Sequence, residues 1–160
     1  MNSKIMKISS EFMYDGQLIA HESVSDGNLK SLVAQNDTEP NPINCADFLP
    51  DLTVPLLMID TAGGKMGDCQ FEDLEKKKGL MGSMSRYNQG EAMIVKALFQ
   101  ELNVAHGIDF RDIGVITPYS AQVDLIGGLL REKNAERADG IEVSTVDGFQ
   151  GREKEVIILS

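Results

Sequence analysis

The chain has 160 residues, which is enough for one domain with a substantial hydrophobic core. Apolar residues make up 42% and charged residues 25%, close to the averages of globular domains, so a disordered tail is excluded. The formal net charge of −10 excludes a uniformly basic nucleic-acid-binding surface; any contact with phosphates has to be local, through hydroxyls, backbone N–H groups or helix N-termini.

The cysteines and the apolar runs indicate where the protein works. Cys45 and Cys69 lie in different surroundings without the spacing of a zinc site, and the two histidines are far apart, so we expect free thiols and no metal centre. No apolar run approaches the ~18 residues of a membrane span, and no apolar block follows Lys4 and Lys7 as in a signal peptide. We therefore expect an intracellular protein, in the nucleus or cytoplasm, with no membrane partner.

In the first half of the chain, one helix and one strand are predicted between long polar segments. Residues 3–14 place apolar side chains at helical spacing. Residues 55–60 form a continuous apolar run, typical of a strand covered on both faces. The segments at about 22–53 and 61–85 are polar and irregular, and we expect long surface loops there, which are either mobile or involved in binding.

In the second half, apolar runs alternate with amphipathic segments. Helices are expected at 89–102 and 120–134, and strands at 113–118, 141–146 and 155–160. Helices between strands favour parallel pairing through right-handed crossovers. Together with residues 55–60, these strands predict an α/β fold with a parallel sheet flanked by helices.

A short glycine-rich segment after the first expected strand is a false lead. Residues 62–66, Ala-Gly-Gly-Lys-Met, look like part of a phosphate-binding loop. Such a loop needs a glycine where the chain has Ile59, and a serine or threonine for Mg²⁺ where it has Met66. The chain therefore lacks this loop, and no Ser/His/Asp or Cys/His pairing suggests hydrolysis by the chain alone.

The most specific segment is the polar turn between the last two expected strands, residues 145–153, Thr-Val-Asp-Gly-Phe-Gln-Gly-Arg-Glu. In open α/β sheets, ligands bind at the carboxyl ends of strands, where this turn begins. The nine residues resemble motif V of superfamily 1 helicases, in the branch that includes the nonsense-mediated-decay helicase and the Smubp type.

Three further segments carry the same resemblance. Residues 114–122, Gly-Val-Ile-Thr-Pro-Tyr-Ser-Ala-Gln, are similar to the family's strand-to-helix pattern V-x-[ST]-P-Y-x-x-Q, and residues 85–92 are similar to its S-x-x-N-x-x-E-A pattern. Residues 12–18, Phe-Met-Tyr-Asp-Gly-Gln-Leu, resemble the sequence after the Q-Y-R motif, in a form typical of the Smubp branch. The resemblance covers essentially the whole chain in the correct order.

The resemblance implies that residues 1–160 are a single, partial RecA-like domain, the second motor domain of an ATP-dependent DNA or RNA helicase. In such helicases the phosphate-binding loop and the Mg²⁺-binding acidic residues belong to the first RecA-like domain, and the arginine-finger motif follows motif V. We therefore expect no complete catalytic site, and no tight binding of ATP or Mg²⁺ by the chain alone. The expected partners are the first RecA-like domain and single-stranded DNA or RNA.

The resemblance also assigns two groups of site residues. Those expected to approach ATP are Gln150, Gly151 and Glu153. Those expected to approach the nucleic-acid strand are Thr117, Pro118, Tyr119, Thr145, Asp147 and Asn88. Simpler explanations stay open, since a ring at position 119 can pack over the sheet and an asparagine at a helix start can cap it. For the chain as a whole, the alternative is a non-catalytic α/β module whose long loops bind a protein partner.

Overall fold

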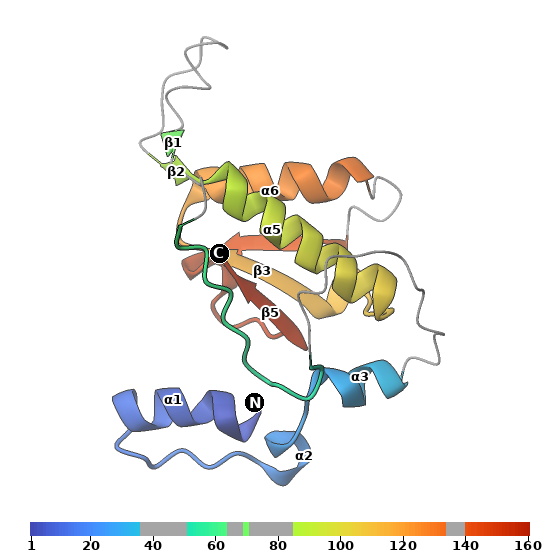
Figure 1. Cartoon of the computed structure of the whole chain (residues 1–160). Helices are drawn as coiled ribbons and strands as arrows, with labels where there is room; N and C mark the ends of the chain where they lie inside the picture. Colours follow the sequence, from blue (N-terminus) through green and yellow to red (C-terminus); the bar gives the residue numbers. More distant parts are fainter. Residues whose placement is uncertain (36–50, 64–68, 71–84, 134–139) are drawn as a thin grey trace.

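The main sheet of the computed structural model is parallel, with the strand order β4-β3-β5 (Figure 1). The structure describes residues 1–35, 51–63, 69–70, 85–133 and 140–160. Within these residues the sheet consists of β3 (Ile113–Thr117), β4 (Glu142–Thr145) and β5 (Val156–Leu159). Strands β1 (Cys69–Gln70) and β2 (Arg86–Tyr87) form a separate antiparallel pair. The strands predicted at 113–118, 141–146 and 155–160 and their parallel pairing are confirmed.

Strand β3 is the central strand, paired with β4 on one edge and β5 on the other, and it is covered on both faces. Alternate residues of a strand point to opposite faces, and Ile113 and Val115 are fully buried in the core on one of them. Gly114 belongs to the other face. A Cβ on Gly114 would lie 3.0 Å from Cγ of Lys154 and 3.2 Å from the ring of Phe149. The absence of a side chain at position 114 therefore lets the segment after β4 pack against the sheet.

Helices α5 (Gln89–Gln100) and α6 (Ser120–Lys133) lie together on one side of the sheet (Figure 1). Helix α5 buries Ala92, Val95 and Phe99, which are spaced to share one helix face, and the Phe99 ring stacks on Phe110 with 5.4 Å between centroids. A π-helical turn, η1 (Glu101–Ala105), continues α5, so both predicted helices are confirmed. In the described part of the chain, no helix is long and apolar enough to cross a membrane.

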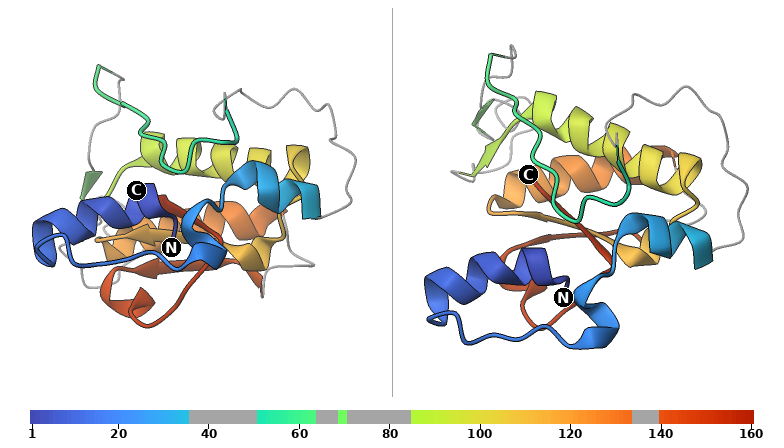
Figure 2. Two further views of the ribbon diagram at one scale, coloured as in Figure 1. Left: turned by 90° about the horizontal axis from the view of Figure 1, so that it is seen from below. Right: turned by 60° about the horizontal axis from the view of Figure 1, so that its bottom comes forward.

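The N-terminal part forms helices α1 (Ser3–Met13), α2 (Glu22–Ser25) and α3 (Leu29–Gln35). Helices α1 and α2 lie on the β5 side of the sheet, away from α6 (Figures 1 and 2). Helix α1 confirms the prediction for 3–14. The irregular chain predicted from residue 22 onward is wrong for 22–35, because His21 and Asn28 cap α2 and α3 by accepting hydrogen bonds from the backbone N–H groups of Ser23 and Ser31. Most of the two predicted loops, at 36–50, 64–68 and 71–84, lies outside the described residues.

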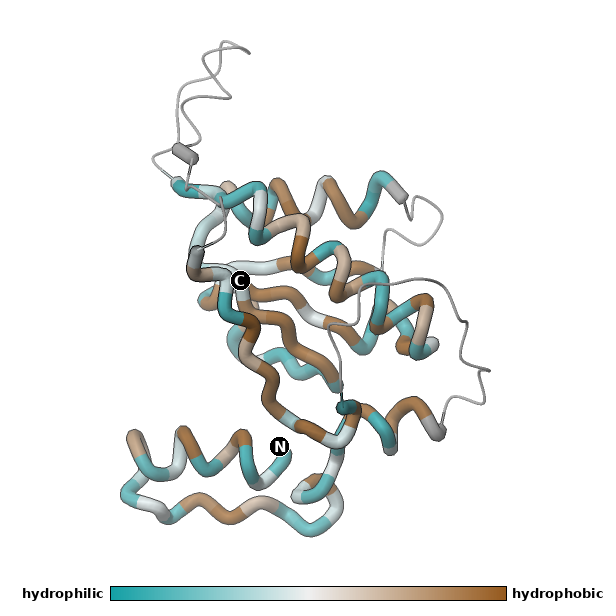
Figure 3. The backbone as a smooth tube through the Cα atoms, in the orientation of Figure 1, coloured by the Kyte–Doolittle hydropathy of each residue, from teal (hydrophilic) through white to brown (hydrophobic). Residues whose placement is uncertain are grey.

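Residues 55–60 are not a strand, and that prediction is wrong. In the described structure β5 pairs with β3 alone, and the side chains of Leu56, Leu57 and Met58 are exposed, Met58 at 89%. Figure 3 shows apolar colour along β3, along β5 and along this segment, so hydropathy alone does not distinguish a paired strand from an exposed extended segment. The difference lies in a hydrogen-bonding partner, which depends on the rest of the fold.

Candidate functional site

The carboxyl edge of β3 and β4 brings together most of the residues expected to approach a nucleic-acid strand. Thr117 and Thr145 are register partners at the ends of the two strands. Pro118 and Tyr119 follow β3 directly, and Asp147 begins the short 3₁₀ helix η4 (Asp147–Phe149) after β4. Tyr119 is 46% exposed. Because β3 and β4 run parallel, segments that are distant in sequence end at the same edge.

Thr117 is the buried member of this group. The residue is 1% exposed, and its Oγ1 has no hydrogen-bond partner among the described residues. A buried polar group without a partner costs about 1–3 kcal/mol. The hydroxyl therefore keeps its capacity to donate and accept a hydrogen bond, but its burial closes it to a partner in the structure as it stands.

Asn88 is held in a buried network. Its side-chain oxygen accepts a hydrogen bond from Glu91 N at 3.0 Å, which caps α5. The Gln122 amide bonds to both backbone groups of Asn88, at 2.8 and 3.3 Å, and donates to Ser160 Oγ at 3.2 Å. Gln122 thus ties the starts of α5 and α6 to the end of β5. Contact of Asn88 with a strand stays a prediction, whereas its helix-capping role is observed.

The role of Gln122 was missed by sequence reasoning, although a signal was present. Gln122 is the final residue of the Thr-Pro-Tyr pattern in 114–122, and a glutamine at that spacing falls in the first turn of α6. It is 2% exposed. A buried amide needs hydrogen-bond partners, and these come from residues far away in sequence.

Gln150, Gly151 and Glu153 are exposed in the segment between β4 and β5, which includes η4 and which we call the motif V loop (residues 146–155). Gly151 has φ of +77°, a conformation that costs little only for glycine. An exposed amide and an exposed carboxylate can bond to the hydroxyl and amino groups of a nucleotide, and the carboxylate repels phosphate. Contact of Gln150, Gly151 and Glu153 with ATP stays a prediction. In the described residues, no group of three or more His, Cys, Asp or Glu side chains is placed so as to hold a metal ion.

Two contacts hold the first half of the motif V loop. Gly148 N donates to Thr145 Oγ1 at 3.2 Å, which closes the turn after β4. The ring of Phe149 is buried over Gly114 on the central strand. The loop therefore folds back across the sheet before it reaches Gln150.

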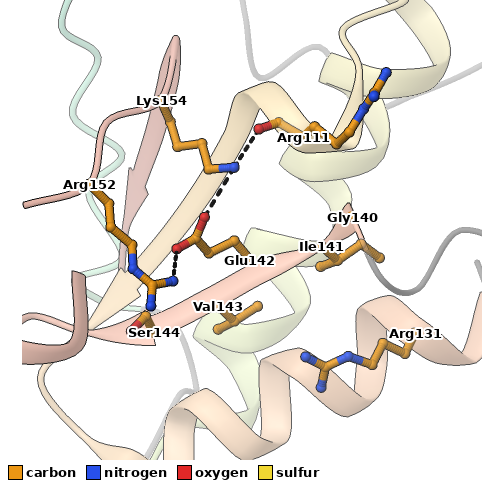
Figure 4. Close-up of a pocket in the computed structure, with 9 residues that line it drawn as sticks. All are labelled: Arg111, Arg131, Gly140, Ile141, Glu142, Val143, Ser144, Arg152 and Lys154. Atoms are coloured by element: carbon orange, nitrogen blue, oxygen red, sulfur yellow. Dashed lines mark hydrogen bonds and ion pairs between the residues drawn. The ribbon is translucent and has the colours of Figure 1, made fainter.

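Glu142, at the start of β4, holds the second half of the motif V loop (Figure 4). Its Oε1 accepts from Arg152 Nη1 at 2.6 Å, and its Oε2 is 3.0 Å from Lys154 Nζ. Lys154 Nζ also donates to the carbonyl of Arg111, which lies in the short 3₁₀ helix (Phe110–Asp112) before β3. The hydrogen bond from Arg152, followed by that from Lys154, lowers the pKa of Glu142 against the opposing effect of burial. Sequence reasoning missed Glu142, because nothing local marks a strand glutamate as an anchor.

An open hollow of about 620 Å³ lies beside β4 and is lined by Glu142 and its partners Arg152 and Lys154, together with Arg111 (Figure 4). Arg131 borders it from α6. It extends along β4 from Glu142 to Ser144, and none of the residues assigned to the nucleic-acid strand lines it.

A parallel α/β sheet with a Thr-Pro-Tyr turn and a motif V loop on adjacent strands defines a RecA-like domain of the superfamily 1 helicase class. A family model described as an AAA domain matches residues 1–160, and the chain belongs to this family. The resemblance to the Upf1-like helicases and their Smubp branch is thereby confirmed.

Curated relatives are similar over the full length of this chain. DNA-binding protein SMUBP-2 of Rattus norvegicus is 42% identical, DNA polymerase alpha-associated DNA helicase A of Saccharomyces cerevisiae 38%, and DNA replication ATP-dependent helicase/nuclease DNA2 of Homo sapiens 28%. The chain spans 14% of the rat and human proteins and 21% of the yeast protein.

Proposed function

We propose that this chain is the second motor domain of an ATP-dependent helicase that moves along single-stranded nucleic acid. Relatives named as a DNA helicase and as an ATP-dependent helicase/nuclease support this function. The observation that carries the proposal is one continuous segment, residues 145–153, which begins beside Thr117 and ends in exposed residues assigned to ATP. A segment that reaches both ligands suits a motor that couples them.

On the nucleotide side, Glu153 accepts a hydrogen bond from a ribose hydroxyl, and Gln150 and Gly151 lie in the same cleft. A hydrogen bond to a charged group contributes about 1–3 kcal/mol. That is less than the cost of association, so the chain needs a partner that binds the phosphates and Mg²⁺, the first RecA-like domain. ATP binding closes the two domains around the nucleotide, and hydrolysis reopens them.

On the strand side, Tyr119 stacks on a base, while Thr145 and Asp147 lie along the backbone together with the turn at Thr117 and Pro118. Stacking accepts any base, as a translocating motor requires. The relatives' names specify DNA, which favours single-stranded DNA as the strand and a site of action inside the cell, in the nucleus or cytoplasm.

The proposal is tested in the complete helicase with Glu153→Ala. We expect the KM for ATP to rise by about tenfold, the equivalent of one charged hydrogen bond, with a smaller effect on single-strand affinity. Glu155→Ala is the matched control, since Glu155 is an exposed neighbour without an assigned role. The 160-residue chain alone is expected to show no ATP turnover. Turnover by that chain, abolished by Glu153→Ala, would contradict the proposal.

A further inference from the structure

The two residues that flank Glu153 are both bound to one carboxylate. Glu142 contacts Arg152 through one oxygen, at 2.6 Å, and Lys154 through the other, at 3.0 Å. The side chains of Glu142 and Lys154 are 19% and 16% exposed, whereas Glu153 is exposed. Arg152 and Lys154 therefore turn toward β4, and the residue between them faces solvent.

This arrangement differs from an ordinary surface ion pair. Exposed pairs contribute little, because water screens them and two long side chains must be ordered. Here the side chains of Glu142 and Lys154 are mostly covered while Arg152 is 58% exposed, each Glu142 oxygen has its own cation, and Lys154 also bonds to the Arg111 carbonyl. Loss of the carboxylate charge would remove the counter-charge of both cations, and Lys154 would keep its bond to the Arg111 carbonyl.

The loop is anchored to the central strand on both sides of the exposed residues. Phe149, before them, and Lys154, after them, both lie against Gly114. Between these points the chain contains no helix or strand that could hold Gln150–Glu153 in place. Arg152 N closes a turn on the Phe149 carbonyl at 3.0 Å, and the ion pairs to Glu142 hold the side chains on both sides of Glu153.

We propose that Glu142 is a positioning residue, which sets the place of Glu153 in the nucleotide cleft by holding Arg152 and Lys154. Glu142 itself lies at the start of β4, at the opposite end of the strand from Thr145, and is not among the residues assigned to either ligand. This inference rests on the proposed function, in which Glu153 approaches ATP.

The test uses the complete helicase with Glu142→Gln, which keeps the shape and removes the charge. Hydrogen–deuterium exchange is measured on peptides that cover 147–155, and ATP kinetics on the same protein. We expect faster exchange in this loop, with exchange of β3 unchanged, and a KM for ATP raised about three- to tenfold with a smaller change in kcat. Glu142→Asp, which keeps the charge, is expected to restore part of the KM. Glu11→Gln is the matched control, because it removes a carboxylate from an exposed pair with Lys7.

A second variant guards against misfolding. Arg152→Gln removes one side of the arrangement at a residue whose side chain is 58% exposed, and it is expected to raise the KM in the same direction. In the double variant Glu142→Gln/Arg152→Gln, the two effects are expected to be less than additive, since both remove the same contact.

The outcomes separate this inference from the proposed function. A raised KM in Glu153→Ala with an unchanged KM in Glu142→Gln and Arg152→Gln would overturn the inference alone, even if loop exchange increased. An unchanged KM in Glu153→Ala would overturn the proposed nucleotide role of the loop, and the positioning role with it. Full additivity in the double variant would show that Glu142 acts by a route other than Arg152, against the inference.

Discussion

Thr117 and Thr145 are partners in the parallel ladder, yet their hydroxyls have different environments. Thr145 Oγ1 accepts a hydrogen bond from Gly148 N and closes the turn after β4. Thr117 Oγ1 is buried, with no partner within the described chain. Two equivalent positions at one sheet edge thus have different roles: one hydroxyl maintains the motif V loop, and the other costs stability in the unbound domain.

Replacing Thr117 with valine is expected to separate stability from binding. The valine keeps the shape and removes the unpaired hydroxyl, so the free energy of unfolding is expected to rise by about 1 kcal/mol, measured by urea denaturation. Single-strand affinity of the complete helicase, measured by fluorescence anisotropy, is expected to fall. Thr145→Val is the comparison for stability alone and is expected to destabilise the domain, because it removes the hydrogen bond from Gly148 N. A stabilised Thr117→Val protein with unchanged affinity would limit Thr117 to a structural role.

Removal of the Tyr119 ring is expected to weaken strand binding. If the half-exposed ring stacks on a base, Tyr119→Ala weakens binding by about 1–3 kcal/mol, and Tyr119→Phe, which keeps the ring, changes affinity little. Tyr14→Ala is the control, since Tyr14 is a similarly exposed tyrosine at the end of α1. Anisotropy and thermal melts are measured together. A lower melting temperature with strand affinity preserved would show that the ring only packs over the sheet.

The Gln122 amide is expected to be essential for stability. Gln122→Leu has similar volume but removes the side-chain partner of the buried Asn88 N–H, whereas the Asn88 carbonyl keeps its hydrogen bond from Ala92 N at 3.0 Å. We expect a loss of about 1–3 kcal/mol in the free energy of unfolding, the cost of losing the partner of one buried group. The control Gln89→Leu changes an exposed glutamine at the start of α5. Equal stabilities of the two variants would argue against the network.

The contribution of Glu142 to stability is expected to depend on pH. Its pKa is lowered in the folded protein, so its contribution is present above the ordinary glutamate pKa of about 4.3 and is lost as the pH falls through the folded value. The stability difference between the unsubstituted protein and Glu142→Gln is therefore expected to be constant from pH 7 to about 5 and to shrink below about 4.3. Urea denaturation across this range measures it. A difference that persists unchanged at pH 3 would mean that packing, not charge, is responsible.

The order of helices and strands in the second half of the chain was predictable because each element carries its own signal. Residues 113–117 are apolar on both faces, and Asn88 with Glu91 marks a helix start. The segment 55–60 carries the same apolar signal without becoming a strand. Hydropathy reports a tendency toward burial, whereas strand pairing requires a free sheet edge in register.

The sequence by itself determined the family and the edge on which its motifs meet, because the motifs 114–122 and 145–153 are contiguous and the carboxyl ends of parallel strands share an edge. Only the tertiary structure decided which of the assigned site residues are accessible to a ligand. Thr117 and Asn88 are buried, whereas Tyr119 and Glu153 are exposed. It also decided that Glu142 binds both neighbours of Glu153. Burial and ion pairing depend on residues that the fold brings together, and no local pattern encodes their distances.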